Sequence, residues 1–356
     1  MEYLTREVEK RVPIYLVSDK LIDLKLHLEK IDFDKIIVVT DSNVHKLWGK
    51  VLNESIKGFN STFFTFKAGE LSKNFSTYQK LYNKILDYGI TKKTLIIAFG
   101  GGVTGNIVGL IAATLYRGVR FVHIPTTIIA QADSTIGGKQ AINTKHGKNI
   151  LGVFYEPEFI FADFQFLKTL PEREIACGIS ECIKHALCQD NVLFERIYAR
   201  EENFAFIEDI ITKTIHLKLN IIEKDRKEIN EGKILLYGHT IGHAIETLSK
   251  GKLNHGEAIS IGMCCAAQVS NQLSFLSEEN LQIHYEIFKK WNLPTNMPKY
   301  IKIDQVIKQL NYDKKMKDSK IELILLESIG KILKIDNKVG MSISEDQLKF
   351  FLKKCY

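Results

Sequence analysis

The stretch Thr94-Leu95-Ile96-Ile97-Ala98-Phe99-Gly100-Gly101-Gly102-Val103-Thr104-Gly105-Asn106 decides the fold of the first half of this chain. Its apolar run predicts a buried strand, and the glycines that follow allow a ligand to approach the backbone at the start of a helix. The spacing is not the GxGxxG fingerprint, because the third glycine falls elsewhere. The stretch predicts a dinucleotide or phosphate site in a doubly wound domain, with a plain tight turn as the alternative.

The segments around this stretch alternate between strands and helices. Helical periodicity covers residues 75–88 and 106–115, and short apolar runs predict strands at 13–17, 35–40, 61–66 and 120–124. This alternation predicts a parallel sheet with helices on both faces. We therefore expect residues 1–168 to form an N-terminal, doubly wound, Rossmann-like domain of the α/β class that binds NAD.

The pattern changes after about residue 171. A strand pair is expected at 321–326 and 331–335, turned by Gly330, and helices are expected at 172–187, 194–199, 206–222, 233–249, 256–273, 278–291 and 344–353. We expect residues 169–356 to form a mostly α-helical domain that binds a metal and the substrate. A ligand cleft between the two domains is the default expectation.

The bulk composition limits the classes of function. The 356-residue chain is 45% hydrophobic and 26% charged, as ordinary globular proteins are. Basic residues exceed acidic ones by 49 − 42 = 7 and are spread along the chain, so we expect an anionic small substrate and no nucleic acid. No signal peptide and no membrane span are expected. Six cysteines without a CxxC pair indicate reduced thiols and a cytoplasmic protein.

Three histidines gather in a short segment of the second half. His239 and His243 are four residues apart, so on a helix they share one face, and His255 follows after a glycine-containing loop. Imidazoles that converge in this way indicate a divalent metal. The HxxxH pair alone is equally consistent with a helix that holds two satisfied histidines.

A glutamate in an apolar segment supplies a further ligand. Glu181 and Lys184 lie three residues apart in a predicted helix whose other residues, among them Ile179 and Ile183, are apolar. A buried glutamate needs a partner, although a surface ion pair is the plainer interpretation of this spacing. Two histidines and one carboxylate form a catalytic zinc arrangement, so Glu181 is expected to join His239 and His255.

Other polar segments are candidates for ligand contacts. Residues 133–139 and 146–149 are expected to be loops that carry a carboxylate and lysines suited to phosphate, with a solvated basic loop as the alternative. Thr126 and Thr127 follow Pro125 at the carboxyl end of a predicted strand, where open α/β sheets bind ligands. Helix capping is an equal alternative for these two threonines.

Together these motifs resemble the 3-dehydroquinate synthase family, the sugar-phosphate cyclases. The resemblance spans essentially the whole chain, at residues 100–106, 117–118, 125–127, 133–139, 147–149, 167–171, 181–184, 238–246, 255–257 and 313–315. It implies NAD, zinc or cobalt, a sugar-phosphate substrate and a homodimer. The implied reaction oxidises a ring hydroxyl transiently, eliminates phosphate, returns the hydride, and closes a carbocycle by an intramolecular aldol step.

The resemblance also assigns roles by motif. The metal ligands would be Glu181, His239 and His255. The catalytic residues would be Asp133, Lys139, Lys184 and His243. The substrate would contact Asn149, Lys227, Lys315 and, from the partner subunit, Arg117. NAD would contact Asp41, Asn43, Glu70, Lys73, Gly101, Gly102, Val103, Thr104, Gly105, Asn106, Thr126, Thr127, Lys148, Phe166, Leu167, Lys168 and Thr169.

Several positions depart from dehydroquinate synthases. Asn106 stands where the glycine loop of that family ends in Asp, and Gln140-Ala141 replaces Thr-Gly. Ahead of the first metal histidine, Gly232 and Leu236 occupy the positions of an Arg and an Asn that help to bind the substrate carboxylate or its surroundings. Loss of the guanidinium would leave a desolvated carboxylate without its partner.

Asn106, Gln140-Ala141, Gly232 and residues 237–243 are similar to 2-deoxy-scyllo-inosose synthase, which cyclises glucose 6-phosphate, whereas Leu236 fits neither enzyme. Gly137-Gly138 and Lys227 are more similar to dehydroquinate synthases, and Lys227 could serve a carboxylate. We therefore expect an inosose-synthase-like cyclase, with the 3-dehydroquinate synthase of the shikimate pathway as the alternative.

Two other functional classes stay open. A metal-dependent polyol dehydrogenase shares the two-domain plan and NAD, but Glu181-x-x-Lys184 and the lysine-rich segment 133–149 argue against it. A metal-stabilised binding or regulatory protein is a non-enzymatic alternative, and Leu236 is the feature in its favour.

Overall fold

The structure is a computed structural model that describes residues 10–201, 203–313 and 320–356. The chain divides into two compact units. Unit 1 comprises Met1–Thr126, Gly138–Ile142 and Gly152–Gln165, and unit 2 comprises Thr127–Gly137, Asn143–Leu151 and Phe166–Tyr356. The main division lies close to the expected boundary at 168/169. Residues 127–137 and 143–151, however, group with unit 2 and not with the N-terminal domain.

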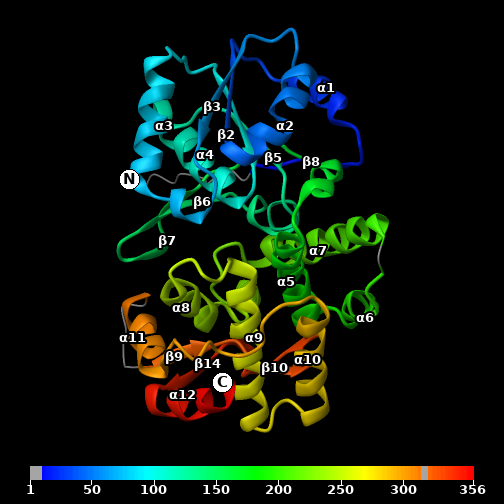
Figure 1. Cartoon of the computed structure of the whole chain (residues 1–356), viewed down its shortest axis with the longest axis vertical. Helices are drawn as coiled ribbons and strands as arrows, with labels where there is room; N and C mark the ends of the chain where they lie inside the picture. Colours follow the sequence, from blue (N-terminus) through cyan, green and yellow to red (C-terminus); the bar gives the residue numbers. More distant parts are fainter. Residues whose placement is uncertain (1–9, 202, 314–319) are drawn as a thin grey trace, which may run out of the picture. The chain divides into compact units, whose positions relative to one another are not determined.

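Unit 1 is built on a six-stranded parallel sheet in the order β1-β8-β5-β4-β2-β3 (Figure 1). Its strands are β1 (Ile14–Val17), β2 (Ile36–Asp41), β3 (Ser61–Phe66), β4 (Leu95–Gly100), β5 (Phe121–Pro125) and β8 (Ile160–Asp163). The expected parallel sheet is confirmed, and β4 lies at its centre, as its uninterrupted apolar run predicts. The four-residue strand β8 was not predicted, because so short an apolar run is a weak signal.

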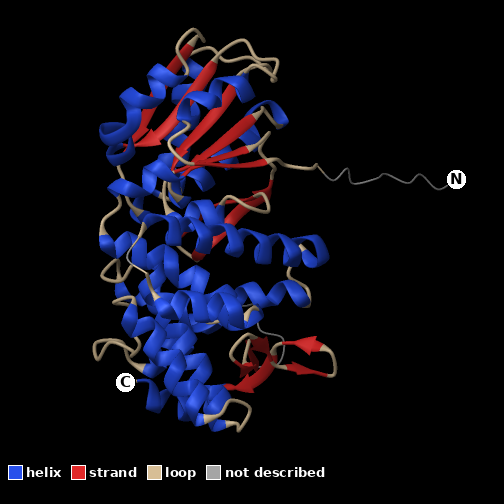
Figure 2. Cartoon of the chain, turned by 90° about the vertical axis from the view of Figure 1, so that its right-hand side faces the viewer, coloured by secondary structure: helices blue, strands red, loops and turns tan. Residues whose placement is uncertain are grey.

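The helices of unit 1 cover both faces of this sheet (Figure 2). They are α1 (Leu24–Leu28), α2 (Ser42–Ser55), α3 (Phe75–Asp87) and α4 (Gly102–Thr114). Leu81 of α3 and Ile107 of α4 share one core with Ile37 and Ile96 of the sheet. Right-handed crossovers place α1 and α2 on the opposite face, because the strand order reverses direction after β3.

The glycine stretch lies at the start of α4. The helix begins at Gly102, with Gly101 as its N-cap residue, and not at residue 106 as expected. The backbone N–H groups of its first turn are those that a phosphate would use. At the neighbouring strand end, the Asp41 carboxylate caps α2 by accepting from the N–H of Asn43 at 2.9 Å and of Val44 at 3.1 Å.

Unit 2 is mostly helical, as expected. Its helices are α5 (Glu172–Gln189), α6 (Asn191–Ala199), α7 (Phe204–Asp225), α8 (His239–Ser249), α9 (His255–Gln272), α10 (Glu278–Lys290), α11 (Ile303–Asp313) and α12 (Glu345–Leu352). The continuous helix expected at 233–249 is wrong. A 3₁₀ turn, Glu231–Leu236, comes first, and α8 starts at His239 because Gly238 has a left-handed backbone with φ +74°.

Two further expectations about strands are corrected. The predicted pairing of 321–326 with 331–335 is wrong in part. The first segment, β9 (Lys320–Leu323), pairs instead with β14 (Met341–Ser344). Two further pairs follow one another along the chain: β10 (Leu326–Ser328) with β11 (Lys331–Ile332), and β12 (Lys334–Ile335) with β13 (Lys338–Val339). The segments expected as loops form a π-helical turn, Ala130–Ser134, and the paired strands β6 (Lys139–Thr144) and β7 (Gly147–Phe154).

Within the described part of the chain, no helix has both the length and the apolar character needed to cross a membrane.

Helices α8 and α9 of unit 2 contact each other backbone to backbone (Figure 1). A Cβ added at Gly262 of α9 would lie 2.1 Å from the Gly238 carbonyl oxygen and 2.6 Å from the Gly242 nitrogen. At the start of α9, a Cβ at Gly256 would lie 2.4 Å from Cα of Cys177 on α5. The three helices that carry Glu181, His239 and His255 can therefore approach closely only because these positions have no side chain.

We predict that Gly262→Ala destabilises the protein by about 1–3 kcal/mol or more, because the added methyl group must push α8 away from α9. Chemical denaturation measures the change in the free energy of unfolding. The control is Gln268→Ala on the same helix, which adds no volume and should change stability by less than about 0.5 kcal/mol. Equal stability of Gly262→Ala and the wild type would show that the two helices are not in tight contact.

Candidate metal centre and active site

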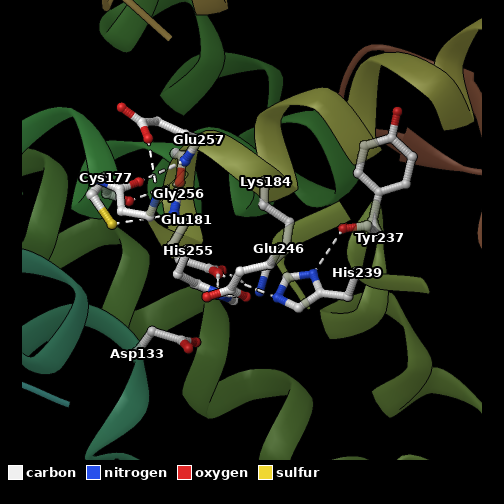
Figure 3. A network of polar contacts seen from close by, with 12 residues as sticks. Asp133, Cys177, Glu181, Lys184, Tyr237, His239, Glu246, His255, Gly256 and Glu257 are labelled. Atoms are coloured by element: carbon white, nitrogen blue, oxygen red, sulfur yellow. Dashed lines mark hydrogen bonds and ion pairs between the residues drawn. The ribbon is translucent and has the colours of Figure 1, made fainter. Parts of the chain in front are cut away.

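Three side chains from three helices of unit 2 converge on one point (Figure 3). Oε1 of Glu181, on α5, lies 3.3 Å from Nε2 of His239, on α8, and 3.1 Å from Nε2 of His255, on α9. Glu181 is fully buried, whereas the His255 side chain is 27% exposed, so the cluster is reachable from outside. These three side chains are the ones that the sequence analysis proposes as metal ligands.

The other nitrogen of each imidazole also faces an acceptor, which favours a proton on Nδ1 when Nε2 binds a metal. Nδ1 of His239 lies 3.0 Å from the carbonyl oxygen of Tyr237, and Nδ1 of His255 lies 3.1 Å from Oε2 of Glu246. A proton on each Nδ1 leaves each Nε2 lone pair directed toward Glu181. Metal-bound histidines are held in this way by a carbonyl or a carboxylate.

The spacing of the donor atoms fits a divalent metal ion. Nitrogen and oxygen ligands at about 2.0–2.1 Å from a tetrahedral ion lie roughly 3.3 Å apart. The two distances to Glu181, 3.1 and 3.3 Å, are close to that value. Burial alone would lower the pKa of His255, but its hydrogen bonds to Glu181 and Glu246 raise it to about 9. A metal ion would replace the proton that these carboxylates otherwise favour.

His243 lies beside the same cluster. Its ligating nitrogen and those of His239 and His255 are all within 4.8 Å of one another. Burial, together with its two histidine neighbours, holds the pKa of His243 well below the usual range, so the imidazole is neutral. A neutral imidazole next to a metal site can act as a fourth ligand or accept a proton, and the proton role is the one proposed from the sequence.

A buried ammonium accompanies the Glu181 carboxylate. Nζ of Lys184 lies 2.5 Å from Oε2 of Glu181, and both side chains are buried. Burial alone would raise the pKa of Glu181, but Lys184 and His239 hold it well below the usual range. The surface ion pair considered from the sequence is therefore wrong, and the buried alternative is confirmed.

Asp133, which is half-buried, pairs with a buried lysine that the sequence did not suggest. Lys218 of α7 donates to its Oδ1 at 2.7 Å and to its carbonyl oxygen at 2.5 Å, and Nε2 of His185 lies 3.7 Å from Oδ1. Burial alone would raise the pKa of Asp133, but the ammonium groups of Lys218 and Lys184 hold it well below the usual range.

Lys218, His185 and Glu246 were not assigned a role from the sequence. Lys218 interrupts the apolar stripe of α7 three residues after Ile215, and a lysine in a buried stripe is the signal that points to a partner. Glu246 also pairs with Lys148, so a chain of contacts runs from Lys148 through Glu246 and His255 to Glu181.

The other proposed substrate residues lie elsewhere. Asn149, on β7, and Lys227, just beyond α7, have exposed side chains in unit 2. Arg117 and Lys139 are exposed residues of unit 1. Arg117 has a left-handed backbone with φ +65°, which is uncommon for a residue with a side chain. Lys315 lies outside the described residues.

The residues proposed for NAD divide between the units. Thr126 directly follows β5, and its N–H donates to the Gly100 carbonyl oxygen at 3.1 Å. Unit 1 contains Asp41, Asn43, Glu70, Lys73, Gly101, Gly102, Val103, Thr104, Gly105, Asn106 and Thr126. Unit 2 contains Thr127, Lys148, Phe166, Leu167, Lys168 and Thr169. Within unit 1, Thr104 donates to the Asp41 carboxylate at 3.4 Å, which joins the ends of two neighbouring strands.

Comparison with known proteins identifies the family. Residues 63–177 match the family described as 3-dehydroquinate synthase N-terminal, and residues 178–316 match 3-dehydroquinate synthase C-terminal. The chain belongs to the 3-dehydroquinate synthase family. It is therefore a sugar-phosphate cyclase of a family whose enzymes are phosphate-eliminating lyases, as the sequence motifs indicated.

Relatives in this family carry two kinds of name. The 3-dehydroquinate synthase of Thermoanaerobacter pseudethanolicus is 38% identical over 93% of this chain and 96% of its own. That of Rippkaea orientalis is 36% identical over 93% of each chain. A 2-deoxy-scyllo-inosose synthase solved with carbaglucose-6-phosphate, NAD+ and Co2+ has a TM-score of 0.88 and is 29% identical over 96% of each chain. A glycerol dehydrogenase of Schizosaccharomyces pombe shares the fold alone. It is 15% identical over 99% of this chain and 91% of its own, with a TM-score of 0.66.

We predict that Glu181→Gln and His255→Ala abolish stoichiometric binding of zinc or cobalt, because each removes one donor of a three-residue set. His243→Ala should keep the metal and lose phosphate release. Metal content after gel filtration measures the first effect, and His216→Ala, which alters an exposed histidine of α7, is the control. Normal metal content in His255→Ala would contradict the ligand set, and loss of metal from His243→Ala would make His243 a ligand.

We predict that Lys218→Met raises the pKa of Asp133, because the carboxylate loses its nearest ammonium group. The acid limb of the pH–rate profile for phosphate release should move to higher pH, and activity should fall roughly 10- to 100-fold. Metal content should not change. Lys213→Met, which removes a lysine paired with Asp209 on the exposed face of the same helix, is the matched control. An unchanged profile would show that Asp133 does not titrate in the reaction.

Proposed function

We propose that this enzyme is an NAD- and divalent-metal-dependent cyclase of a sugar phosphate that lacks a carboxylate, and that glucose 6-phosphate is the first candidate. The metal ligands in this proposal are Glu181, His239 and His255. The inosose synthase of the same fold is named with NAD+, Co2+ and a glucose 6-phosphate analogue, which supports this choice of cofactors and substrate class.

The geometry at Gly232 carries the substrate assignment. This position corresponds to the arginine that the resemblance assigns to carboxylate binding in dehydroquinate synthases. A Cβ at Gly232 would lie 2.3 Å from the Asp225 carbonyl oxygen and 3.2 Å from its carboxylate. The Gly232 N–H donates to Oδ2 of Asp225 at 3.0 Å, and the same carboxylate accepts from the N–H of Asn230 at 2.6 Å. The loop is closed on the aspartate, so it has no room for any side chain at 232.

Leu236 supports the same conclusion. It occupies the position of the asparagine in dehydroquinate synthases, and its half-buried aliphatic side chain can neither donate nor accept a hydrogen bond. A substrate carboxylate at this place would lose charge-assisted hydrogen bonds, each of which is worth about 1.5–3 kcal/mol. A neutral hydroxyl or hydrogen on the sugar would lose much less.

The alternative is a 3-dehydroquinate synthase. The higher identity to relatives with that name, 36–38% against 29% for the inosose synthase, favours it. In that case another cation must bind the carboxylate. Lys227 was proposed for this role, and its exposed side chain leaves it able to reach a ligand.

The residues of unit 2 have separable roles in the proposed reaction. When bound, NAD supplies transient oxidation of a ring hydroxyl, and the metal polarises that oxygen as a Lewis acid. The neutral imidazole of His243 accepts and returns a proton beside the metal ligands. Lys184 and Lys218 keep Glu181 and Asp133 ionised, and Lys184 also presents positive charge to a phosphate. Glu246 holds His255 in the tautomer that leaves Nε2 free.

We further propose a cytoplasmic homodimer in which Arg117 reaches the substrate phosphate of the partner subunit. The exposed, left-handed position of Arg117 suits a contact outside its own chain. Ile150, Val153 and Phe154 of β7 are exposed apolar residues, at 55, 41 and 47%, which supports an interface at this strand.

We predict that glucose 6-phosphate releases phosphate in the presence of NAD and cobalt or zinc, whereas the seven-carbon keto-acid phosphate of the shikimate pathway reacts at least about tenfold more slowly in kcat/KM. Sedoheptulose 7-phosphate is the matched seven-carbon substrate without a carboxylate. Turnover of the keto acid alone would overturn the substrate assignment and establish the alternative, and net formation of NADH from a polyol would indicate a dehydrogenase.

A further inference from the structure

The residue that precedes the left-handed Gly238 has an unusual environment. Tyr237 is among the largest side chains that are fully buried in the described part of the chain. Its hydroxyl lies 2.9 Å from Nε2 of His284 on α10 and 3.3 Å from the carbonyl oxygen of Met263 on α9. Its own carbonyl oxygen is the partner of Nδ1 of His239 (Figure 3). One residue thus connects two helices, α9 and α10, to a proposed metal ligand on α8.

The chemistry of the buried pair determines its hydrogen bonds. His284 is fully buried, and burial lowers its pKa to about 3, so its imidazole is neutral. Burial also raises the pKa of Tyr237 well above its usual value, so the ring is a phenol. In one arrangement, Nε2–H of His284 donates to the tyrosine oxygen, the hydroxyl donates to the Met263 carbonyl, and Nδ1 of His284 is the unprotonated nitrogen without a partner.

The backbone at this place lies between two helical elements, and the Tyr237 N–H donates to the Ile234 carbonyl oxygen at 3.1 Å. The 3₁₀ turn ends at Leu236, α8 begins at His239, and the left-handed Gly238 lies between them. The Tyr237 carbonyl therefore belongs to no regular helix, and the anchored tyrosine ring is one of the contacts that hold its peptide. The hydrogen bonds to α9 and α10 are at the far end of that ring.

We propose that the Tyr237–His284 pair is a positioning device for His239, because it orients the carbonyl that keeps Nδ1 protonated and directs Nε2 toward Glu181. The inference rests on the proposed metal site, and it adds two positioning residues that do not themselves touch metal or substrate. Their role is to set the affinity and the coordination geometry of the ion.

The test compares Tyr237→Phe, His284→Leu, His284→Gln and the double variant Tyr237→Phe/His284→Leu. Three properties are measured: zinc affinity by chelator competition, the visible absorption spectrum of the cobalt-loaded protein, and thermal unfolding of the metal-free protein. Tyr198→Phe is the matched control, because it removes a hydroxyl that donates to Glu286 on α10 at 2.7 Å, away from the metal ligands.

We expect each of Tyr237→Phe and His284→Leu to weaken zinc binding about tenfold or more and to change the cobalt spectrum. His284→Gln, whose amide can still donate to the hydroxyl, should bind zinc almost as the wild type does. The double variant has neither the tyrosine hydroxyl nor the imidazole, so no buried polar group of this pair is left without a partner. Its thermal stability should therefore recover relative to the single variants, while its zinc affinity stays low.

Two results would overturn the inference: wild-type zinc affinity and cobalt spectrum in Tyr237→Phe, or recovery of zinc affinity together with stability in the double variant. Either would mean that the pair only packs the core. If the wild type itself bound no metal and released no phosphate, the proposed function would fail instead, so the two failures are distinguishable.

Discussion

The close contact of α8 with α9, and of α9 with α5, is the constraint on which the site depends. Imidazole and carboxylate ligands are short, so they meet only if the helices that carry them approach within backbone contact. Gly262 and Gly256 make that approach possible, because a Cβ at either position would overlap with the backbone of the neighbouring helix. The same contact places His255 at the first residue of α9, beside Cys177, one helical turn before Glu181 on α5.

The second constraint in unit 2 is that the carboxylates near the site are paired with cationic or imidazole groups. Each buried carboxylate near the site has a cationic or imidazole neighbour: Glu181 has Lys184, Asp133 has Lys218, and Glu246 has Lys148 and His255. Isolated buried charges would be costly, and pairing keeps the carboxylates ionised although burial alone opposes this. The result is a polar interior that can hold a cation and an anionic substrate side by side.

In the proposed function, substrate selection involves backbone as well as side chains. The loop that ends at Gly232 is closed by Asp225, whose carboxylate accepts three backbone N–H groups, from Ile229, Asn230 and Gly232. A guanidinium cannot be restored there by one substitution, because the backbone itself fills the space. The proposal therefore assigns the choice of anion to one loop, independently of the proposed metal ligands.

The sequence by itself determined the parallel sheet and the helical second half, and it led to the metal ligand set that is proposed for this enzyme. These features depend on local signals that can be recognised in the sequence without the fold. The signals are apolar runs, their alternation with helices, and the chemistry of histidine and glutamate. Tertiary structure decided the break before α8, the strand pairing after residue 320, and the strands at 139–144 and 147–154, because those features depend on partners distant in sequence. Tyr237, Lys218 and Glu246 acquired roles for the same reason: each looks ordinary in the sequence, and only folding brings it to His284, Asp133 and His255.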